Sequence, residues 1–122
     1  MSRFGRSIRP HVDAELREAF EAEARGDASA AFAHLERAHV LGQASTLQHV
    51  RVHWRMLRFG MRRRDTRECL GQVLRIGGAA TKTAFGLVPD GNTGGSNVSP
   101  FRRMPIEPEL EARIDRARAS SG

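Results

Sequence analysis

The chain has 122 residues, of which 39% are hydrophobic, and this length is enough for one domain with a single core. Its formal net charge is +6, and all but one of its 20 basic residues are arginines. A single cysteine excludes a disulfide framework, and no apolar run approaches the roughly 20 residues of a membrane helix. The start of the chain lacks the apolar run of a signal peptide, so we expect a cytoplasmic protein.

Two helices are predicted in the first third of the sequence, after a basic N-terminal arm at residues 1–10. Apolar residues at helical spacing indicate a helix over residues 12–26, which closes on Gly26. Asp27 is a suitable N-cap for a second helix, and Gly42 is expected to end that helix in a left-handed turn. The connection between the two helices is short, which predicts an antiparallel hairpin.

A third helix is predicted to begin at Ser45, which forms a capping box with Gln48. Apolar residues then recur every three or four positions, as expected for the core-facing side of a helix. We expect this core stripe to consist of Leu47, Val50, Trp54, Leu57 and Met61.

Asp65 is predicted to cap a fourth helix, which we expect to fray or end at Gly77 and Gly78 because two adjacent glycines disfavour a helix interior. Residues 86–105 are rich in Gly, Asn and Pro and predict a long loop. A short last helix is expected to start near Glu107, where Pro108 suits its first position. We therefore predict one all-α domain over residues 11–119, with a tail at 120–122.

An internal repeat relates the two predicted hairpins when Asp27 is aligned with Asp65, because small or apolar residues then match at each core offset. The first copy, RGDASAAFAHLERA, is similar to the second half of a tetratricopeptide repeat (TPR). The second copy has Arg64 where that pattern has Gly. We therefore expect two TPR-like helical hairpins and no extended repeat array.

Four strings, HLERAHVLGQ, HVRVHWRML, ECLGQVLRI and GLVPDGNTGGSNVSPFRRMPI, together resemble a family of small, uncharacterised bacterial proteins classified as a domain of unknown function. The resemblance runs from about the first helix to Ile106. Some members of that family are encoded among heavy-metal resistance genes. The resemblance assigns neither a reaction nor a functional residue.

Four residues on the second and third predicted helices form a candidate metal site. Glu36 and His39 are three positions apart, and His49 and His53 are four apart, so each pair shares one helix face. In an antiparallel hairpin the two pairs reach matching heights. Three imidazoles and a carboxylate suit Zn²⁺, and also Cu²⁺, Ni²⁺ or iron. The alternative is that these histidines only bond to nearby backbone or side-chain groups, which would leave a metal-free, TPR-like module that binds a protein partner.

A second candidate surface is the arginine face of the third helix, formed by Arg51, Arg55, Arg58 and Arg62. It could hold an anion or a nucleic-acid backbone. No stacking aromatic is interleaved with these arginines, and we favour pairing with the glutamates of the first helix over nucleic-acid binding.

The sequence offers little support for an enzyme. GNTGGSNV lacks the strand and helix context of a phosphate-binding loop, so we expect it to be a structural loop lying across the helices. Cys69 lies at a predicted core offset, and no serine sits in a nucleophile motif. No catalytic residue is assigned.

Overall fold

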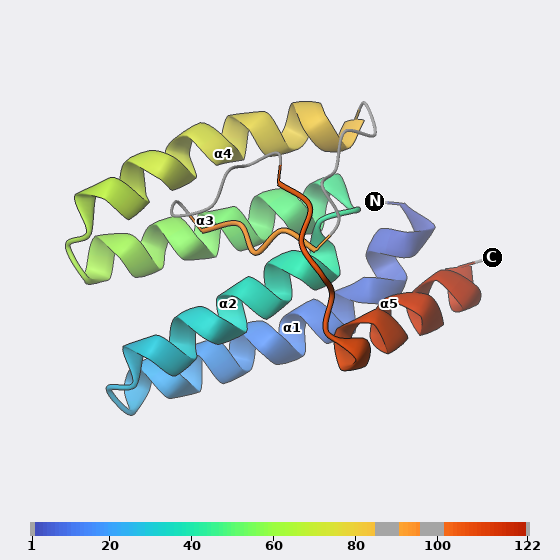
Figure 1. Cartoon of the computed structure of the whole chain (residues 1–122), viewed down its shortest axis with the longest axis horizontal. Helices are drawn as coiled ribbons and strands as arrows, with labels where there is room; N and C mark the ends of the chain where they lie inside the picture. The colour runs from blue at the N-terminus through green and yellow to red at the C-terminus, as the bar shows by residue number, and fades with distance from the viewer. Residues whose placement is uncertain (1, 85–90, 96–101, 122) are drawn as a thin grey trace.

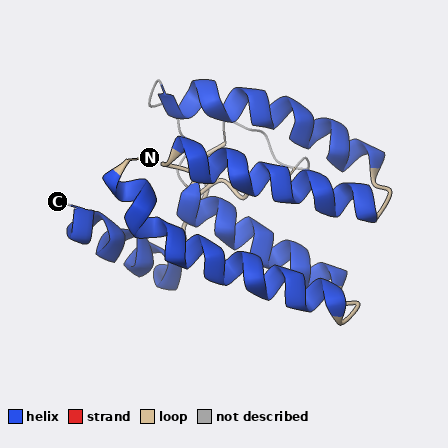
Figure 2. Ribbon diagram, turned by 180° about the vertical axis from the view of Figure 1, so that it is seen from behind, coloured by secondary structure: helices blue, strands red, loops and turns tan. Residues whose placement is uncertain are grey.

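The computed structural model describes residues 2–84, 91–95 and 102–121, and it consists of five helices. The helices are α1 (Arg3–Ala24), α2 (Ala28–Gly42), α3 (Thr46–Arg62), α4 (Thr66–Ala84) and α5 (Pro108–Ser121). α1 and α2 form one antiparallel hairpin, α3 and α4 form another, and α5 lies along α1 (Figure 1). No strand occurs in the described ranges (Figure 2), which confirms the all-α class. The TPR-like character of the hairpins stays a prediction.

The first helix starts earlier than the sequence suggested, because residues 3–10 are helical and do not form an arm. Ser2 caps α1 by accepting a hydrogen bond from the Gly5 N–H, and Ile8 is fully buried in the core. Pro10 stands inside the helix, where its ring removes one backbone hydrogen bond and bends the axis. The α1 ribbon bends in its N-terminal part (Figure 1).

The two hairpin turns are equivalent, as the alignment of Asp27 with Asp65 predicts, but the matched core offsets are not, because Leu70 and Val73 of the second copy are exposed. Asp27 caps α2 through the Ala30 N–H, and Asp65 caps α4 through the Glu68 N–H, both at 3.0 Å. Gly26 has φ +80°, and Arg64, at the equivalent place, also has a positive φ of 56°. A left-handed conformation is costly for a residue with a side chain, so the second turn keeps the shape of the first at some cost in strain.

The glycines behave differently from expectation at two places. α4 continues through Gly77 and Gly78 to Ala84. Gly42 has no positive φ, and it is needed for close packing instead. A Cβ at Gly42 would lie 2.9 Å from the Gln48 Cβ and 3.3 Å from Val12, so the end of α2 can approach the start of α3 only with glycine there.

α3 faces the core with a different side from the one predicted. Leu47, Trp54 and Met61 are each at least half exposed, and among the five predicted core residues only Leu57 is buried. The buried side instead contains Val52, Met56 and Phe59, together with the polar residues Gln48, His49 and His53. The helix is therefore turned by about one residue, or roughly 100°, from the predicted orientation.

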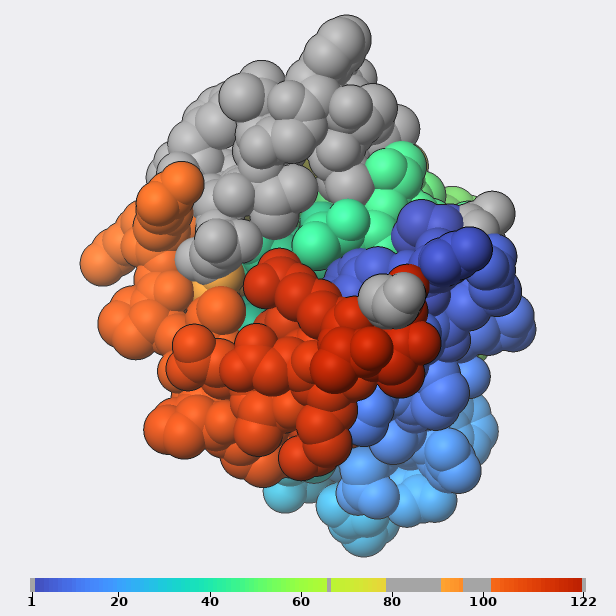
Figure 3. Space-filling view, turned by 90° about the vertical axis from the view of Figure 1, so that its right-hand side faces the viewer, coloured from blue at the N-terminus to red at the C-terminus, as the bar shows by residue number. Residues whose placement is uncertain are grey.

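The hydrophobic core lies among α1, α2, α3 and α5. It is built from Ile8, Val12, Leu16, Ala19, Ala22, Ala31, Leu35, Ala38, Val40, Leu41, Val52, Met56, Phe59, Leu110, Ile114 and Ala117. α5 closes this core by lying against α1, as the red and blue surfaces of Figure 3 show. No helix in the described part of the chain is long and apolar enough to cross a membrane.

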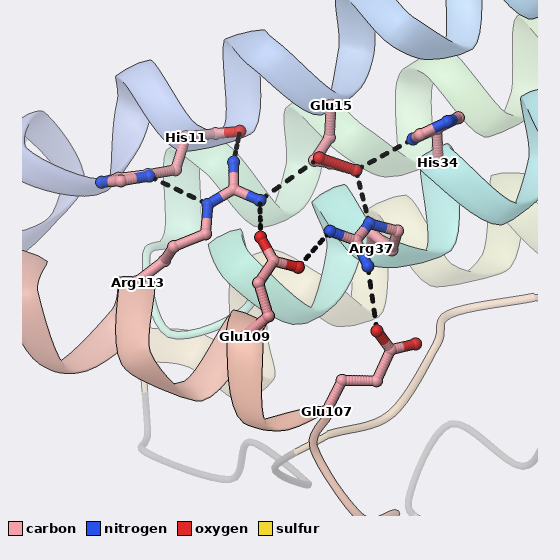
Figure 4. Close-up of polar contacts among 7 residues, drawn as sticks. All are labelled: His11, Glu15, His34, Arg37, Glu107, Glu109 and Arg113. Carbon is pink, nitrogen blue, oxygen red and sulfur yellow. Dashed lines mark hydrogen bonds and ion pairs between the residues drawn. The ribbon is translucent and has the colours of Figure 1, made fainter.

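A buried carboxylate ties α1, α2 and α5 together (Figure 4). Glu15 on α1 is 5% exposed, and its carboxylate contacts His34 at 3.0 Å, Arg37 at 2.6 Å and Arg113 at 3.3 Å. Burial acts to raise the pKa of Glu15, but hydrogen bonds from these three residues and the charge of Arg37 together hold it below its ordinary value. Arg37 also pairs with Glu107 and Glu109, which anchors the start of α5.

We expect Glu15→Gln to lower the free energy of unfolding by about 3 kcal/mol, because the charges of Arg37 and Arg113 would lose their buried partner. Chemical denaturation of the wild type and the variant measures this difference. The control is Glu18→Gln on the exposed side of the same helix, which should change stability by less than about 0.5 kcal/mol.

The effect of Glu15→Gln should also depend on pH. A carboxylate whose pKa is lower in the folded chain stabilises it fully above the unfolded pKa, ordinarily 4.5, and loses that effect as the pH falls through the folded pKa. The difference in the free energy of unfolding between wild type and variant should therefore become smaller at acid pH. A difference that stays the same from about pH 7 to about pH 2 would contradict the assigned role.

Candidate metal centre

Three histidine side chains meet where the two hairpins pack together. His39 comes from the last turns of α2, and His49 and His53 come from successive turns of α3. Their rings are in mutual contact, with centroids 4.7–4.9 Å apart. The three residues are only 2–3% exposed, so the imidazoles lie in the interior.

The Nε2 atoms of the three rings point at one another. His39 Nε2 lies 3.0 Å from His49 Nε2 and 3.1 Å from His53 Nε2. One potential ligand atom from each residue lies within 4.8 Å of the others. Three nitrogens from two helices therefore converge on one point.

The tautomers of two of these rings follow from their outer nitrogens. His39 Nδ1 lies 2.5 Å from the backbone oxygen of Asn92, which can only accept, so Nδ1 carries the proton. His53 Nδ1 lies 2.5 Å from Gln72 Oε1. In the neutral rings, His39 and His53 thus both direct an Nε2 lone pair toward the centre of the cluster.

The orientation of the Gln72 amide is fixed by its own partners. Its Nε2 donates to Glu68 Oε1 at 2.6 Å and to the Gly94 backbone oxygen at 3.0 Å, and both of these are acceptors. The amide oxygen must therefore face His53, where it accepts the Nδ1 proton. Gln72 is fully buried, so α4 contributes a fixed hydrogen-bond acceptor to the cluster.

Residues 91–95 cover the cluster on the α2 side. The Asn92 side chain shapes this segment by accepting from the Gly94 N–H at 2.9 Å and donating to the Arg102 backbone oxygen at 2.7 Å. Gly94 has φ +83°, and a Cβ there would lie 2.4 Å from His39 Cδ2. Gly91 and Gly94 of the GNTGG string adopt left-handed conformations, as predicted, and Gly94 makes room for the His39 ring. The parts of the loop at 85–90 and 96–101 lie outside the described residues.

Glu36, the fourth ligand predicted from the sequence, is not in the group of converging ligand atoms. It is half-buried on α2, and burial raises its pKa, with the charge of Glu68 acting in the same direction and the Thr93 side chain opposing it. The structure thus brings together the three predicted histidines and leaves the predicted carboxylate outside them.

Three of the four residues of the arginine face, Arg51, Arg55 and Arg62, lie near α1. Arg51 pairs with Asp13 at 2.6 Å, and Arg62 pairs with both oxygens of Glu23 at 2.7 and 2.8 Å. Pairing with the first helix is thus confirmed for these two. Arg55 is partly buried between them, and both burial and the neighbouring arginines lower its pKa, while Arg58 is exposed. Cys69 packs against Gly60, apart from the histidines.

Sequence reasoning missed Gln72 and Asn92, the two partners of the outer nitrogens. Gln72 lies three positions after Cys69 and four before Ile76, so it occupies a core position of an otherwise apolar helix face. A glutamine at such a position signals a buried hydrogen-bond partner. Asn92 gave no comparable signal, because its backbone oxygen makes the contact.

The spacing of His39 from each of the other two imidazoles agrees with what a metal ion requires. Ligand nitrogens at about 2.0–2.1 Å from a tetrahedral ion are separated by about 3.3 Å, and those at right angles around an octahedral ion by about 3.0 Å. The two Nε2 distances from His39 fall in or next to this range. Outer nitrogens bound to carbonyl oxygens are also typical of metal-ligating histidines.

Fold and site together define a small all-α domain with a buried three-histidine centre between two helical hairpins. The chain belongs to the family described as Protein of unknown function (DUF3703), which matches residues 6–114. No curated protein and no solved structure matches the chain.

We expect Gly94→Ala to disturb the His39 ring directly, because the new methyl group would overlap it. The matched control is Gly26→Ala, which has a similar φ of +80° but nothing within 4 Å of the added Cβ. Both variants bear the left-handed strain, and Gly94→Ala should cost a further 1–3 kcal/mol or so from overpacking. Denaturation and the ¹⁵N shifts of the histidine rings measure both effects. Equal costs and an unmoved His39 ring would disprove this packing.

Proposed function

We propose that this protein binds one transition-metal ion in the cytoplasm through the Nε2 atoms of His39, His49 and His53. The observation that carries the proposal is the convergence of three buried Nε2 atoms at a point toward which two rings direct lone pairs. A cation at that point turns mutually repelling lone pairs into ligands.

A purely structural role for the histidines explains the arrangement less well. A proton on His49 Nε2 can satisfy one contact with His39, but the contact between His39 and His53 then stays lone pair against lone pair at 3.1 Å. A protonated His53 would supply the missing hydrogen at the cost of a charge in the interior. A bound metal ion removes both difficulties.

The three imidazole nitrogens favour a transition-metal ion of intermediate softness. Imidazole nitrogens suit Zn²⁺, Cu²⁺, Ni²⁺ and iron, whereas Mg²⁺ and Ca²⁺ prefer oxygen and Cu⁺ prefers sulfur. Three histidines leave at least one coordination position, because these ions take four or more ligands. Glu36 lies outside the cluster and the described residues supply no further ligand atom to it, so we leave that position to a ligand from outside the described part of the chain.

Metal titration tests the proposal. We expect calorimetry on untagged protein to show one Zn²⁺, Ni²⁺ or Cu²⁺ per chain, and the double variant His49→Ala/His53→Ala to lose that binding. The control His11→Ala/His34→Ala removes the same number of imidazoles from outside the cluster and should retain it. Absence of binding in the wild type, or equal binding in both double variants, would leave the histidines as a protonated structural cluster.

The role of Gln72 gives an independent prediction. Gln72→Leu removes the acceptor that orients His53 and should weaken metal binding by about 10–100-fold. Gln72→Glu keeps an oxygen at that place and should weaken binding less. Competition titration against a chromogenic chelator measures the affinities, and unfolding without metal checks the fold. Wild-type affinity in Gln72→Leu would show that the amide does not support the site.

A further inference from the structure

The α3–α4 hairpin has an exposed apolar surface, which we call the hairpin face. Its residues are large, hydrophobic and each at least 50% exposed: Leu47, Trp54 and Met61 on α3, and Leu70, Val73 and Leu74 on α4. Single exposed apolar residues are normal, but a contiguous group of this size on a small domain marks an interaction surface.

The contacts between α3 and α4 show that these residues share one side. His53 bonds to Gln72, and Gly60 packs against Cys69, so these positions mark the line where the two helices meet. Trp54 follows His53 by one residue, and Leu70 and Val73 follow Cys69 and Gln72 by one. Because the helices are antiparallel, a step of one residue, about 100°, turns both toward the same side of the hairpin. Leu47 and Met61 lie seven residues from Trp54, two turns along the same stripe.

The α1–α2 hairpin shows how a helix can cover a surface of this kind. α5 lies against α1 and α2, where it buries Leu110, Ile114 and Ala117. Its acidic residues Glu107 and Glu109 pair with Arg37 of α2. Among the five described helices, α4 packs only against α3, so none of these helices covers the hairpin face as α5 covers the first hairpin.

The charges around the hairpin face are almost all of one sign. α3 contains no acidic residue, and the only one on α4, Glu68, is bonded to Gln72. Arg58, Arg64 and Arg67 are exposed on or beside the two helices, as is Asp65 in the turn between them, whereas Arg63 lies over the ring of Phe59. A second copy of this chain, docked by the same face, would oppose arginine with arginine, whereas an acidic partner would complement it.

We propose that the hairpin face binds an amphipathic helix of a partner protein whose apolar stripe is flanked by acidic residues. The apolar stripe packs along Leu47, Trp54 and Met61 and against Leu70 and Val73. The acidic flanks pair with the arginines at the rim, as α5 pairs with Arg37 on the first hairpin. This inference is independent of metal binding.

Trp54 is the only tryptophan, so its fluorescence reports on the hairpin face alone. The probes are two helical peptides without tryptophan, with the same leucine stripe and either glutamate or lysine at the flanking positions. We expect the glutamate peptide to shift Trp54 emission to the blue in a saturable way. The lysine peptide should bind at least about tenfold more weakly, and added salt should reduce the difference.

Two variants locate the binding. Val73→Glu on the hairpin face should abolish the shift, whereas Phe20→Glu should not, because Phe20 is an exposed apolar residue on α1, outside the hairpin face. Circular dichroism checks that both variants fold.

Three results would overturn the proposal. The first is no response of Trp54 to the glutamate peptide, or an equal response to both peptides. The second is a blue shift that grows with protein concentration alone, together with a dimer in sedimentation velocity, which would make the face a self-association surface. The third is a shift caused by phosphatidylglycerol vesicles and not by the glutamate peptide, which would make it a membrane contact.

Discussion

Burying three imidazoles against one another is the constraint on which this structure depends. Nitrogen atoms inside a protein need partners, and the outer nitrogens of His39 and His53 find them on segment 91–95 and on α4. Gln72 on α4 and the backbone of Asn92 each bind an outer nitrogen, and Gly94 leaves space for the His39 ring. Segment 91–95, which has no regular secondary structure, is thereby fixed between the two hairpins.

A second buried polar group, on α1, differs from the histidine cluster in how its charge is compensated. The Glu15 carboxylate is surrounded by His34, Arg37 and Arg113, so its charge is compensated within the chain. In the histidine cluster, by contrast, Nε2 of His39 faces Nε2 of His53 at 3.1 Å, so two acceptor nitrogens meet when both rings are neutral. This contrast separates a polar network that holds helices together from one that is suited to take up a cation.

Much of the fold could be read from local signals. Asp27 and Asp65 cap helices as predicted, because capping depends on a side chain and an amide three residues away. The pairing of His39 with His49 and His53 followed from helix spacing and an antiparallel turn. The side of α3 that faces inward did not follow, because the apolar stripe of Leu47, Trp54 and Met61 competes with a partly polar one. Amphipathicity identifies two different faces of a helix without telling which one the domain itself buries.

The hydrogen-bond partners of the histidine cluster could not be predicted from the sequence, for a different reason. Gln72 and Asn92 are 19 and 53 residues away from the histidines that they contact. Contacts over such separations depend on the packing of the hairpins and on the path of the loop, and no spacing rule encodes them. Glu36 has suitable spacing to His39 but lies outside the group of converging ligand atoms, because helical periodicity places a residue on a face without fixing the direction of its side chain.

The cover formed by segment 91–95 has a consequence for kinetics. With the histidines only 2–3% exposed, nothing can reach their inner nitrogens by simple diffusion from solvent. Exchange at the cluster requires local opening, and the contacts of this segment with His39 and Gln72 are among those that such an opening would break. For a metal ion held as proposed above, these two hydrogen bonds would therefore contribute to its residence time, and sequence changes in the segment would alter the rates of loading and release as well as the affinity.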